Sequence, residues 1–318
     1  MTPFVKVEDL SKSRYGKRPE ERSLEELLDA GMVVVDKPQG PTSHQVSAWV
    51  RDLLGLRKTA HGGTLDPRVT GVLPIALSDA VRALDALHVG DKEYVAVLRL
   101  HQDVPEERVR EVMEEFVGEI YQMPPVRAAV KRELRVRRIY EMEILDRLGR
   151  DYLFRVCCES GTYIRTLCVD LGEALGVGGH MQDLRRTRTA GITEEDAVSL
   201  NDLRDAFVFW KEEGDETGFR KIVRPMEDLL RHLRKVVVKD TAVGALCHGA
   251  SLAAPGIMEI DSGITRGDLV AIFTRKGEVV ALGAAQMNSE QMLSAGSGVA
   301  VGLERVLMNP GTYPDLWK

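Results

Sequence analysis

The sequence has few of the features that mark membrane, secreted or disulfide-rich proteins. No apolar run reaches the roughly 18 uncharged residues of a membrane-spanning helix, and the first residues, with Lys6 and Glu8, lack the apolar region of a signal peptide. The 4 cysteines form no CxxC pair, which favours buried reduced thiols over zinc ligands or disulfides. Internal repeats and low-complexity tracts are also missing. These absences predict a soluble, cytoplasmic, globular protein with no metal site.

Length and charge narrow the prediction further. With 318 residues, 44% of them hydrophobic, the chain is long enough for one large domain and a smaller one. A formal net charge of -6 disfavours indiscriminate attachment to nucleic acid, because the overall field repels phosphates. Basic residues gather nevertheless in three stretches, 124–138, 185–188 and 231–239. Such clusters are usually solvated faces, but separated positive patches of this kind can also follow a phosphate backbone.

The pattern of apolar residues predicts an α+β fold. Alternation predicts strands, whereas capping residues followed by apolar positions at helical spacing predict helices. From residue 235 onward, short β-rich runs separated by glycines are typical of a small barrel. Gly178 and Gly179 lack the Gly-Lys-Ser/Thr ending of a phosphate-binding loop, so no nucleotide cofactor is expected. The expected strands include 32–35, 93–100, 138–147 and 151–159, and the expected helices include 42–55, 78–87, 105–118 and 162–175.

The stretch from His61 to Pro74 is the most informative part of the chain. It holds one carboxylate, Asp66, among glycines, threonines and apolar residues. Its glycines permit backbone angles that other residues avoid, and Pro67 restricts Asp66 to an extended conformation. On spacing alone, an ordinary surface turn explains this composition better than an active site does.

The same stretch resembles the active-site motif of the TruB-type pseudouridine synthases, in the variant carried by dyskerin and its archaeal homologues, the catalytic subunits of H/ACA ribonucleoproteins. Four further stretches resemble motifs of that family in the same order, and the C-terminal region resembles a PUA domain, so nearly the whole chain is covered. The four stretches are Asp36–His44, Lys92–Tyr94, Gly161–Leu167 and His180–Arg188.

The resemblance implies a specific domain organisation. The catalytic domain would be built on a mixed, largely antiparallel sheet with flanking helices, and the PUA domain would be a small β-barrel. We assign residues 31–232 to the catalytic domain and 233–310 to the PUA domain. Residues 1–30 would form an N-terminal arm packing on the PUA domain, and residues 311–318 a tail.

The resemblance also implies the reaction, which is the isomerisation of uridine to pseudouridine in RNA without a cofactor or metal. Asp66 would act as a nucleophile or as a base on the ribose, and the sequence leaves both roles open. Tyr94 would stack on the extruded uracil and help to remove its C5 proton. Arg165 would pair with Asp66 and keep it ionised. From the residues alone, Arg165 is equally well explained as a solvent-facing arginine.

RNA contacts are expected at the flipped nucleotide and along the basic stretches. His61 would fill the gap that the flipped base leaves, although a lone histidine is more often structural. The basic run from residue 124 to 138 falls where the family has its thumb loop, which closes over the substrate RNA. The predicted RNA-binding residues are His61, Lys37, Arg127, Lys131, Arg132, Arg135, Arg185, Arg186, Arg234 and Lys235.

Three functions are compatible with these motifs. The first is guide-directed modification of rRNA, with an H/ACA guide RNA and small H/ACA partner proteins. The second is guide-free modification of the T-loop uridine of tRNA, and the two activities can coexist. The third is a structural RNA-binding scaffold that has lost catalysis. The presence of Asp66, Tyr94 and Arg165 together favours an active enzyme over the scaffold.

Overall fold

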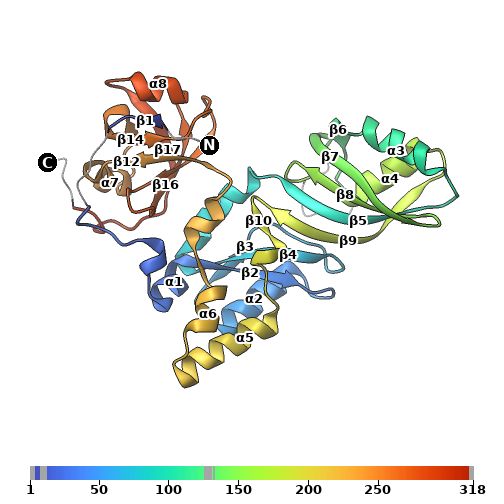
Figure 1. Ribbon diagram of the computed structural model, residues 1–318, viewed down its shortest axis with the longest axis horizontal. Coiled ribbons are helices and arrows are strands. Elements are labelled where there is room, and N and C mark those ends of the chain that lie inside the picture. The colour runs from blue at the N-terminus through green and yellow to red at the C-terminus, as the bar shows by residue number, and fades with distance from the viewer. Residues whose placement is uncertain (1–3, 8–12, 125–130, 132, 315–318) are drawn as a thin grey trace.

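Two β-sheets form the framework of the molecule (Figure 1). The computed structural model describes residues 4–7, 13–124, 131 and 133–314. The larger, 10-stranded sheet has the order β11-β2-β4-β9-β5-β8-β7-β6, with β3 paired to β4 and β10 paired to β9. Only its β4–β9 pair is parallel. Its strands are β2 (Gly31–Lys37), β3 (Thr59–His61), β4 (Thr70–Leu77), β5 (Lys92–Leu100), β6 (Gly118–Gln122), β7 (Arg135–Leu148), β8 (Asp151–Cys158), β9 (Gly179–Thr189), β10 (Ile192–Thr193) and β11 (Arg224–Pro225).

Helices cover the larger sheet, and several begin at residues whose side chains cap them. The Ser23 and Thr42 hydroxyls accept backbone N–H groups at the starts of α1 and α2, as the capping signals predict. The helices are α1 (Leu24–Ala30), α2 (Ser43–Leu53), α3 (Glu106–Glu115), α4 (Ile164–Ala174), α5 (Leu200–Val208) and α6 (Thr217–Ile222), with the 3₁₀ segments η1 (Pro19–Glu21), η2 (Ser78–His88), η3 (Glu194–Asp196) and η5 (Met226–Leu230) and the π-helical η4 (Phe209–Glu213).

The second sheet has seven strands in the order β1-β14-β12-β15-β16-β17-β13, and it buries its own core. All its pairs are antiparallel except β12–β15. The prediction of an α+β fold with mixed, largely antiparallel sheets is therefore confirmed. The strands of this second sheet are β1 (Phe4–Val5), β12 (Arg234–Val238), β13 (Leu252–Ala253), β14 (Ile257–Ile260), β15 (Leu269–Phe273), β16 (Val279–Ala285) and β17 (Val299–Val306). The helices in the same part of the chain are α7 (Asp240–Cys247), α8 (Ser289–Ser294) and the 3₁₀ segment η6 (Ala254–Gly256).

The N-terminal residues are attached to this second sheet. Strand β1 pairs with β14, with Phe4 opposite Ile260. The Lys6 ammonium donates to the carbonyls of Met292 and Ala295, each at 2.6 Å, at the end of α8. These contacts are of the kind that a packing arm requires. The assignment of residues 1–30 to an arm, and the other domain boundaries, stay predictions.

Two segments differ from the sequence-based expectation. Residues 78–88 form the 3₁₀ segment η2 instead of the expected helix of ordinary pitch, and Ser78 enters it with a φ of 44°. More important is β9, which the sequence did not predict as a strand. It lies between β4 and β5, where Arg185 and Arg186 stand opposite Thr70 and Gly71 at the end of the loop that holds Asp66.

Candidate active site

Asp66 lies in the loop between β3 and β4, and two glycines let this loop lie against its neighbours. Gly71 has a φ of +103°, and a Cβ there would lie 2.2 Å from the backbone oxygen of Arg186 in β9. A Cβ on Gly62 would lie 2.1 Å from the side chain of Leu87. A side chain at Gly71 would push the chain away from β9, and one at Gly62 would collide with Leu87 in η2. The glycines therefore fix where Asp66 stands.

Lys37 and Ser43 hold the loop from the side of β2 and α2. The buried Lys37 ammonium donates to the carbonyls of Val69 at 2.8 Å, Pro38 at 3.0 Å and Pro67 at 3.2 Å. The Ser43 hydroxyl accepts from the Leu65 N–H at 2.8 Å and donates to its carbonyl at 3.1 Å. Burial lowers the pKa of Lys37, while nearby Asp66 acts in the opposite direction. The residues on both sides of Asp66 are thus tied to the sheet framework.

Arg165 forms an ion pair with Asp66, with 3.1 Å between Nε and Oδ2. Arg165 is the second residue of α4, and the buried amide of Gln122 fixes the residue before that helix. Gln122 accepts from the Tyr163 N–H at 2.9 Å and donates to the Tyr163 carbonyl at 3.2 Å. The side chains of Arg165 and Asp66 remain 40% and 43% exposed. The pair is formed, and it is still open to an incoming molecule.

Tyr94 stands beside this pair at the start of β5 and is partly buried. Its neighbours Ala96, Leu98 and Leu100 continue the buried row that alternation predicts. The Tyr94 phenol interacts with the guanidinium of Arg186, and Asp66 is also near enough to affect it. Burial raises the pKa of Tyr94, and the positive charge of Arg186 opposes that rise.

His61 ends β3 and packs against the exposed ring of His44, with 4.6 Å between ring centroids. Both of its ring nitrogens are buried, and neither has a hydrogen-bond partner among the described residues. Burial, helped by the charges of His44 and Arg186, lowers the pKa of His61 to about 4. In the RNA-free chain, His61 is therefore a neutral packed side chain, and its role as an RNA contact stays a prediction.

Two residues predicted to bind RNA lie inside the molecule instead. Lys37 and Arg186 are 0% and 1% exposed, and both donate to backbone carbonyls around the Asp66 loop. Their charged groups are shielded from the surface in the RNA-free chain, and RNA binding by these two residues stays a prediction. The identity of a single basic residue in the sequence does not show whether its charged group reaches the surface.

The neighbouring arginines of β9 are paired with acids. Arg185 forms a two-point contact with Asp36 at 2.9 and 3.1 Å and also meets Glu194, and Arg188 meets Asp91 at 2.8 Å. Stretch 185–188 is therefore not a free positive patch.

The first basic stretch is only partly described. Lys131 is exposed and forms an ion pair with Glu133, and Arg135 donates to the Lys131 carbonyl at 3.4 Å. Arg127 and Arg132 lie outside the described residues. RNA binding by these four residues stays a prediction.

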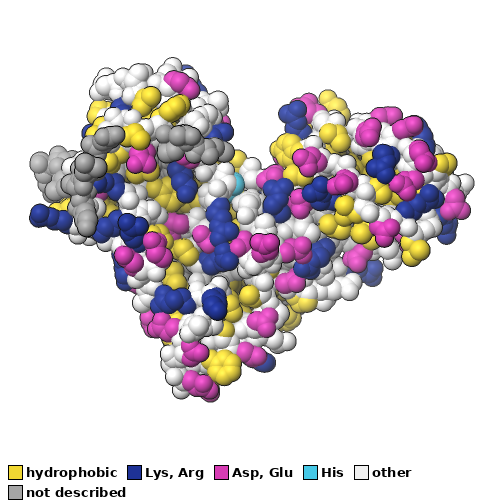
Figure 2. Space-filling model, viewed as in Figure 1, with side chains coloured by type: hydrophobic (Ala, Val, Ile, Leu, Met, Phe, Trp, Pro, Cys, Tyr) yellow, Lys and Arg dark blue, Asp and Glu magenta, His cyan; other side chains and the backbone are white. Residues whose placement is uncertain are grey.

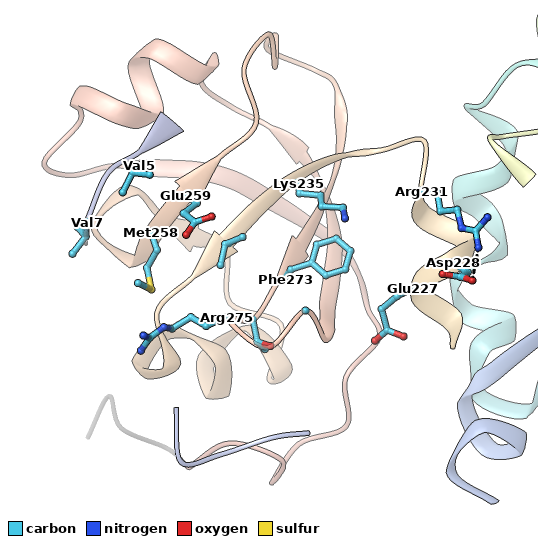
Figure 3. A pocket seen from close by; sticks show the side chains of 13 residues that line it. Val5, Val7, Glu227, Asp228, Arg231, Lys235, Met258, Glu259, Phe273 and Arg275 are labelled. Carbon is cyan, nitrogen blue, oxygen red and sulfur yellow. Dashed lines mark hydrogen bonds and ion pairs between the residues drawn. The ribbon is translucent and has the colours of Figure 1, made fainter. Parts of the chain in front are cut away.

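Arg234 and Lys235 begin β12. Arg234 donates to the Ser262 carbonyl. The exposed Lys235 lies over the ring of Phe273 at 5.1 Å and lines a cavity of about 680 Å³ (Figure 3). This cavity lies between β1, η5 and the second sheet, and its lining contains none of the three predicted catalytic residues. Figure 2 shows basic and acidic side chains interspersed over the visible face rather than separated into one basic surface.

Within the described ranges, no group of three or more His, Cys, Asp or Glu side chains is arranged to hold a metal ion. In the same ranges, no helix is both long and apolar enough to cross a bilayer.

Models of four domain families match consecutive parts of the chain. Residues 3–47 match the DKCLD domain, 51–164 the N-terminal domain of the TruB family pseudouridylate synthases, 165–231 the C-terminal domain of tRNA pseudouridylate synthase B, and 234–307 the PUA domain. The match at 234–307 confirms the prediction of a PUA domain.

Relatives of known sequence and structure match over almost the full length. The "probable tRNA pseudouridine synthase B" of Methanocaldococcus jannaschii is 56% identical over 315 residues, covering 99% of this chain and 94% of that protein. That of Methanopyrus kandleri is 56% identical, with coverages of 99% and 93%. A chain in the crystal structure of a Cbf5-Nop10-Gar1 complex superimposes with a TM-score of 0.94 at 52% identity, covering 98% and 96%. A chain in an H/ACA RNP bound to a substrate RNA containing 2'-deoxyuridine superimposes with a TM-score of 0.92 at 49% identity, covering 99% of this chain and 97% of that chain.

Proposed function

The chain belongs to the TruB family of pseudouridylate synthases and is an RNA pseudouridine synthase, and we propose that Asp66, Tyr94 and Arg165 carry its reaction. The observation that supports these roles is the Asp66–Arg165 ion pair at 3.1 Å, with Tyr94 beside it at the start of β5. Residues from the β3–β4 loop, β5 and α4 thus meet at one place. A single carboxylate with a fixed counter-ion and an adjacent aromatic ring suits a reaction on a base that has been flipped out of RNA.

The chemistry requires three events at that place. The N-glycosidic bond breaks, the base rotates, and C5 of the base joins the sugar. Asp66 acts as the nucleophile or as the base on the ribose, and Arg165 orients it and keeps it ionised. Because both side chains are about two-fifths exposed, the flipped nucleotide itself excludes water from them when it binds.

We propose that the RNA target is chosen in two ways. With an H/ACA guide RNA and small partner proteins, the chain modifies uridines of rRNA as a catalytic subunit. Without a guide, it modifies the T-loop uridine of tRNA. The relatives support the two modes, since those found by sequence are named for tRNA and the structural matches come from complexes named Cbf5-Nop10-Gar1 and H/ACA RNP. We also propose that the protein acts in the cytoplasm, where its four buried cysteines stay reduced thiols.

Mapping of pseudouridine tests this function. The purified chain is incubated with bulk RNA and with tRNA, in the presence and absence of guide RNA and partner proteins. Both modes together predict a guide-dependent product in rRNA and a guide-independent product in the T-loop. Product only with guide would reject the tRNA mode, and product only in tRNA would reject the guided mode. RNA binding with no product under any condition would favour the scaffold.

A further inference from the structure

Arg186 is a buried cation that has no carboxylate partner among the described residues. Its side chain is 1% exposed, and its guanidinium donates to the carbonyls of Val72 at 2.9 Å and Gly63 at 3.2 Å. Tyr94 lies opposite Arg186 in the register of β5 and β9, its phenol interacts with the guanidinium, and none of these partners is a carboxylate. Burying an unpaired charge is costly, and proteins usually supply a counter-ion at such a position. The missing counter-ion therefore calls for an explanation.

The neighbouring arginines show that the chain does supply counter-ions on this strand. Arg185 has Asp36 and Glu194, and Arg188 has Asp91 and Glu93. Both of these arginines are partly exposed, so their need for a partner is smaller than that of Arg186. Among the described arginines of β9, the absence is thus specific to the one that contacts Tyr94.

Tyr94 is the one group in contact with Arg186 that can become negative. The two carbonyls are neutral, and Asp66 is already paired with Arg165. The charged or titratable groups that face the phenol are Arg186 from β9, Asp66 from the loop and Cys158 from β8. Cys158 stays a neutral thiol, because burial raises its pKa to about 12. Arg186 is therefore the group near Tyr94 that favours loss of the phenol proton.

We propose that Arg186 is a positioning residue that acts through Tyr94, holding the phenol oxygen at the C5 hydrogen of the rejoined base and stabilising the phenolate that accepts this proton. This inference rests on the proposed function. After C5 has bonded to the sugar, the C5–H electron pair forms the C5=C6 double bond, and the electrons of the C6=N1 bond move to N1. N1 then takes up a proton. The Tyr94 phenol first gives its own proton to water, the phenolate then takes the C5 proton, and N1 takes a proton from water, so the protons balance and no oxidant or reductant is needed.

A purely structural role for Arg186 is the alternative, and Lys37 provides the matched control. Lys37 is also a fully buried cation that donates only to carbonyls around the same loop, and it has no contact with Tyr94. Replacing either cation by methionine removes a charge and loosens the loop. Only replacement of Arg186 would change the proton transfer at C5.

The test measures single-turnover pseudouridine formation on an RNA that the wild-type chain modifies, with hydrogen or deuterium at C5 of the target uridine. We expect Arg186→Met to slow product formation by about 10²-fold, the order of magnitude for loss of one preorganised electrostatic contact. We also expect it to raise the C5 isotope effect above the wild-type value, because proton removal becomes slower. Lys37→Met should slow the reaction without raising the isotope effect.

A second variant covers the case in which Arg186→Met does not fold. Arg186→Lys keeps the charge but moves it away from the phenol, so it should also raise the C5 isotope effect, by a smaller factor. An isotope effect equal to wild type in the folded Arg186 variants would overturn the inference and leave a structural clamp. A wild-type chain that makes no pseudouridine in any RNA would instead reject the proposed function.

Discussion

Asp66 and Arg165 are joined by an ion pair that contributes little to folding. Because the two side chains are 43% and 40% exposed, water screens their attraction in the RNA-free chain. The pair gains strength only when a bound nucleotide removes that water. In the proposed mechanism, the pair therefore orients Asp66 before the nucleotide binds and stabilises its charge afterwards.

The substitution Arg165→Met should separate the contribution of the ion pair to turnover from its contribution to folding stability. We expect turnover to fall by about 10²- to 10³-fold, since the charge that orients Asp66 is lost. We expect the free energy of unfolding to change by less than about 1 kcal/mol, as for other exposed pairs. Single-turnover rates and denaturant unfolding measure the two effects, with Arg165→Lys as the charge-conserving control. Unchanged turnover in Arg165→Met would contradict the electrostatic role.

His61 makes stability depend on pH through its buried ring. Burial lowers its pKa in the folded chain from 6.5 to about 4, so the folded state binds fewer protons than the unfolded state between these values. The stabilisation from neutral His61 is complete above the unfolded pKa. It is lost as the pH falls through 6.5 towards 4, by at most about 3 kcal/mol.

Denaturant unfolding at several pH values checks this expectation. The difference in unfolding free energy between wild type and His61→Phe should shrink as the pH falls over this window. His88→Gln, at an exposed histidine, should leave the pH dependence unchanged. A wild-type curve parallel to that of His61→Phe would show that His61 is not buried as the structure has it.

At the scale of elements, strand β9 organises the site, and it is one of the strands that sequence patterns did not predict. Its buried positions include Leu184, Arg186 and Thr189, so it lacks the alternation of apolar residues that marks a strand. Arg186 is accommodated there by carbonyl acceptors rather than by apolar neighbours. No periodicity in the sequence encodes such acceptors, because they come from residues more than a hundred positions away.

Gly71→Ala tests the close approach of β4 to β9. The added Cβ would lie 2.2 Å from a backbone oxygen that cannot move freely, at a φ of +103°. We expect a loss of more than about 2 kcal/mol in unfolding free energy, together with reduced turnover. Gly118→Ala, with a φ of +126° and open space around its Cβ, is the control and should lower the free energy of unfolding by less. Equal costs would mean that only backbone strain matters at Gly71.

Charge reversal of Lys131, Arg132 and Arg135 tests the proposed thumb. We expect turnover to fall more than affinity for guide RNA, because the run would close over the substrate instead of anchoring the complex. Single-turnover rates and filter binding of guide RNA compare the two effects, and reversal of Arg108 and Arg110 on the exposed face of α3 is the control. Collapse of guide binding would identify the run as an anchor.

At the scale of the whole molecule, the sequence predicted the fold class and the pairing of Asp66 with Arg165. Order and spacing of motifs pointed to the family, and the Asp66–Arg165 pair follows that expectation. The sequence did not separate surface cations from buried ones. Lys37 and Arg186 are buried basic residues beside the Asp66 loop. Arg185 and Arg188 form ion pairs with acids that lie far from them in the sequence. Net acidity and these pairings leave fewer free positive charges than the basic stretches suggest.

The most direct test of the account is pseudouridine mapping with Asp66→Asn. This change keeps the shape of the side chain and removes its charge, so the loop, Lys37 and Ser43 should hold their positions. We predict that pseudouridine formation is abolished on every RNA that the wild-type chain modifies, while affinity for the same RNA stays within a few-fold. Pseudouridine formed by Asp66→Asn at the wild-type rate would contradict the assignment of this carboxylate as the centre of the reaction.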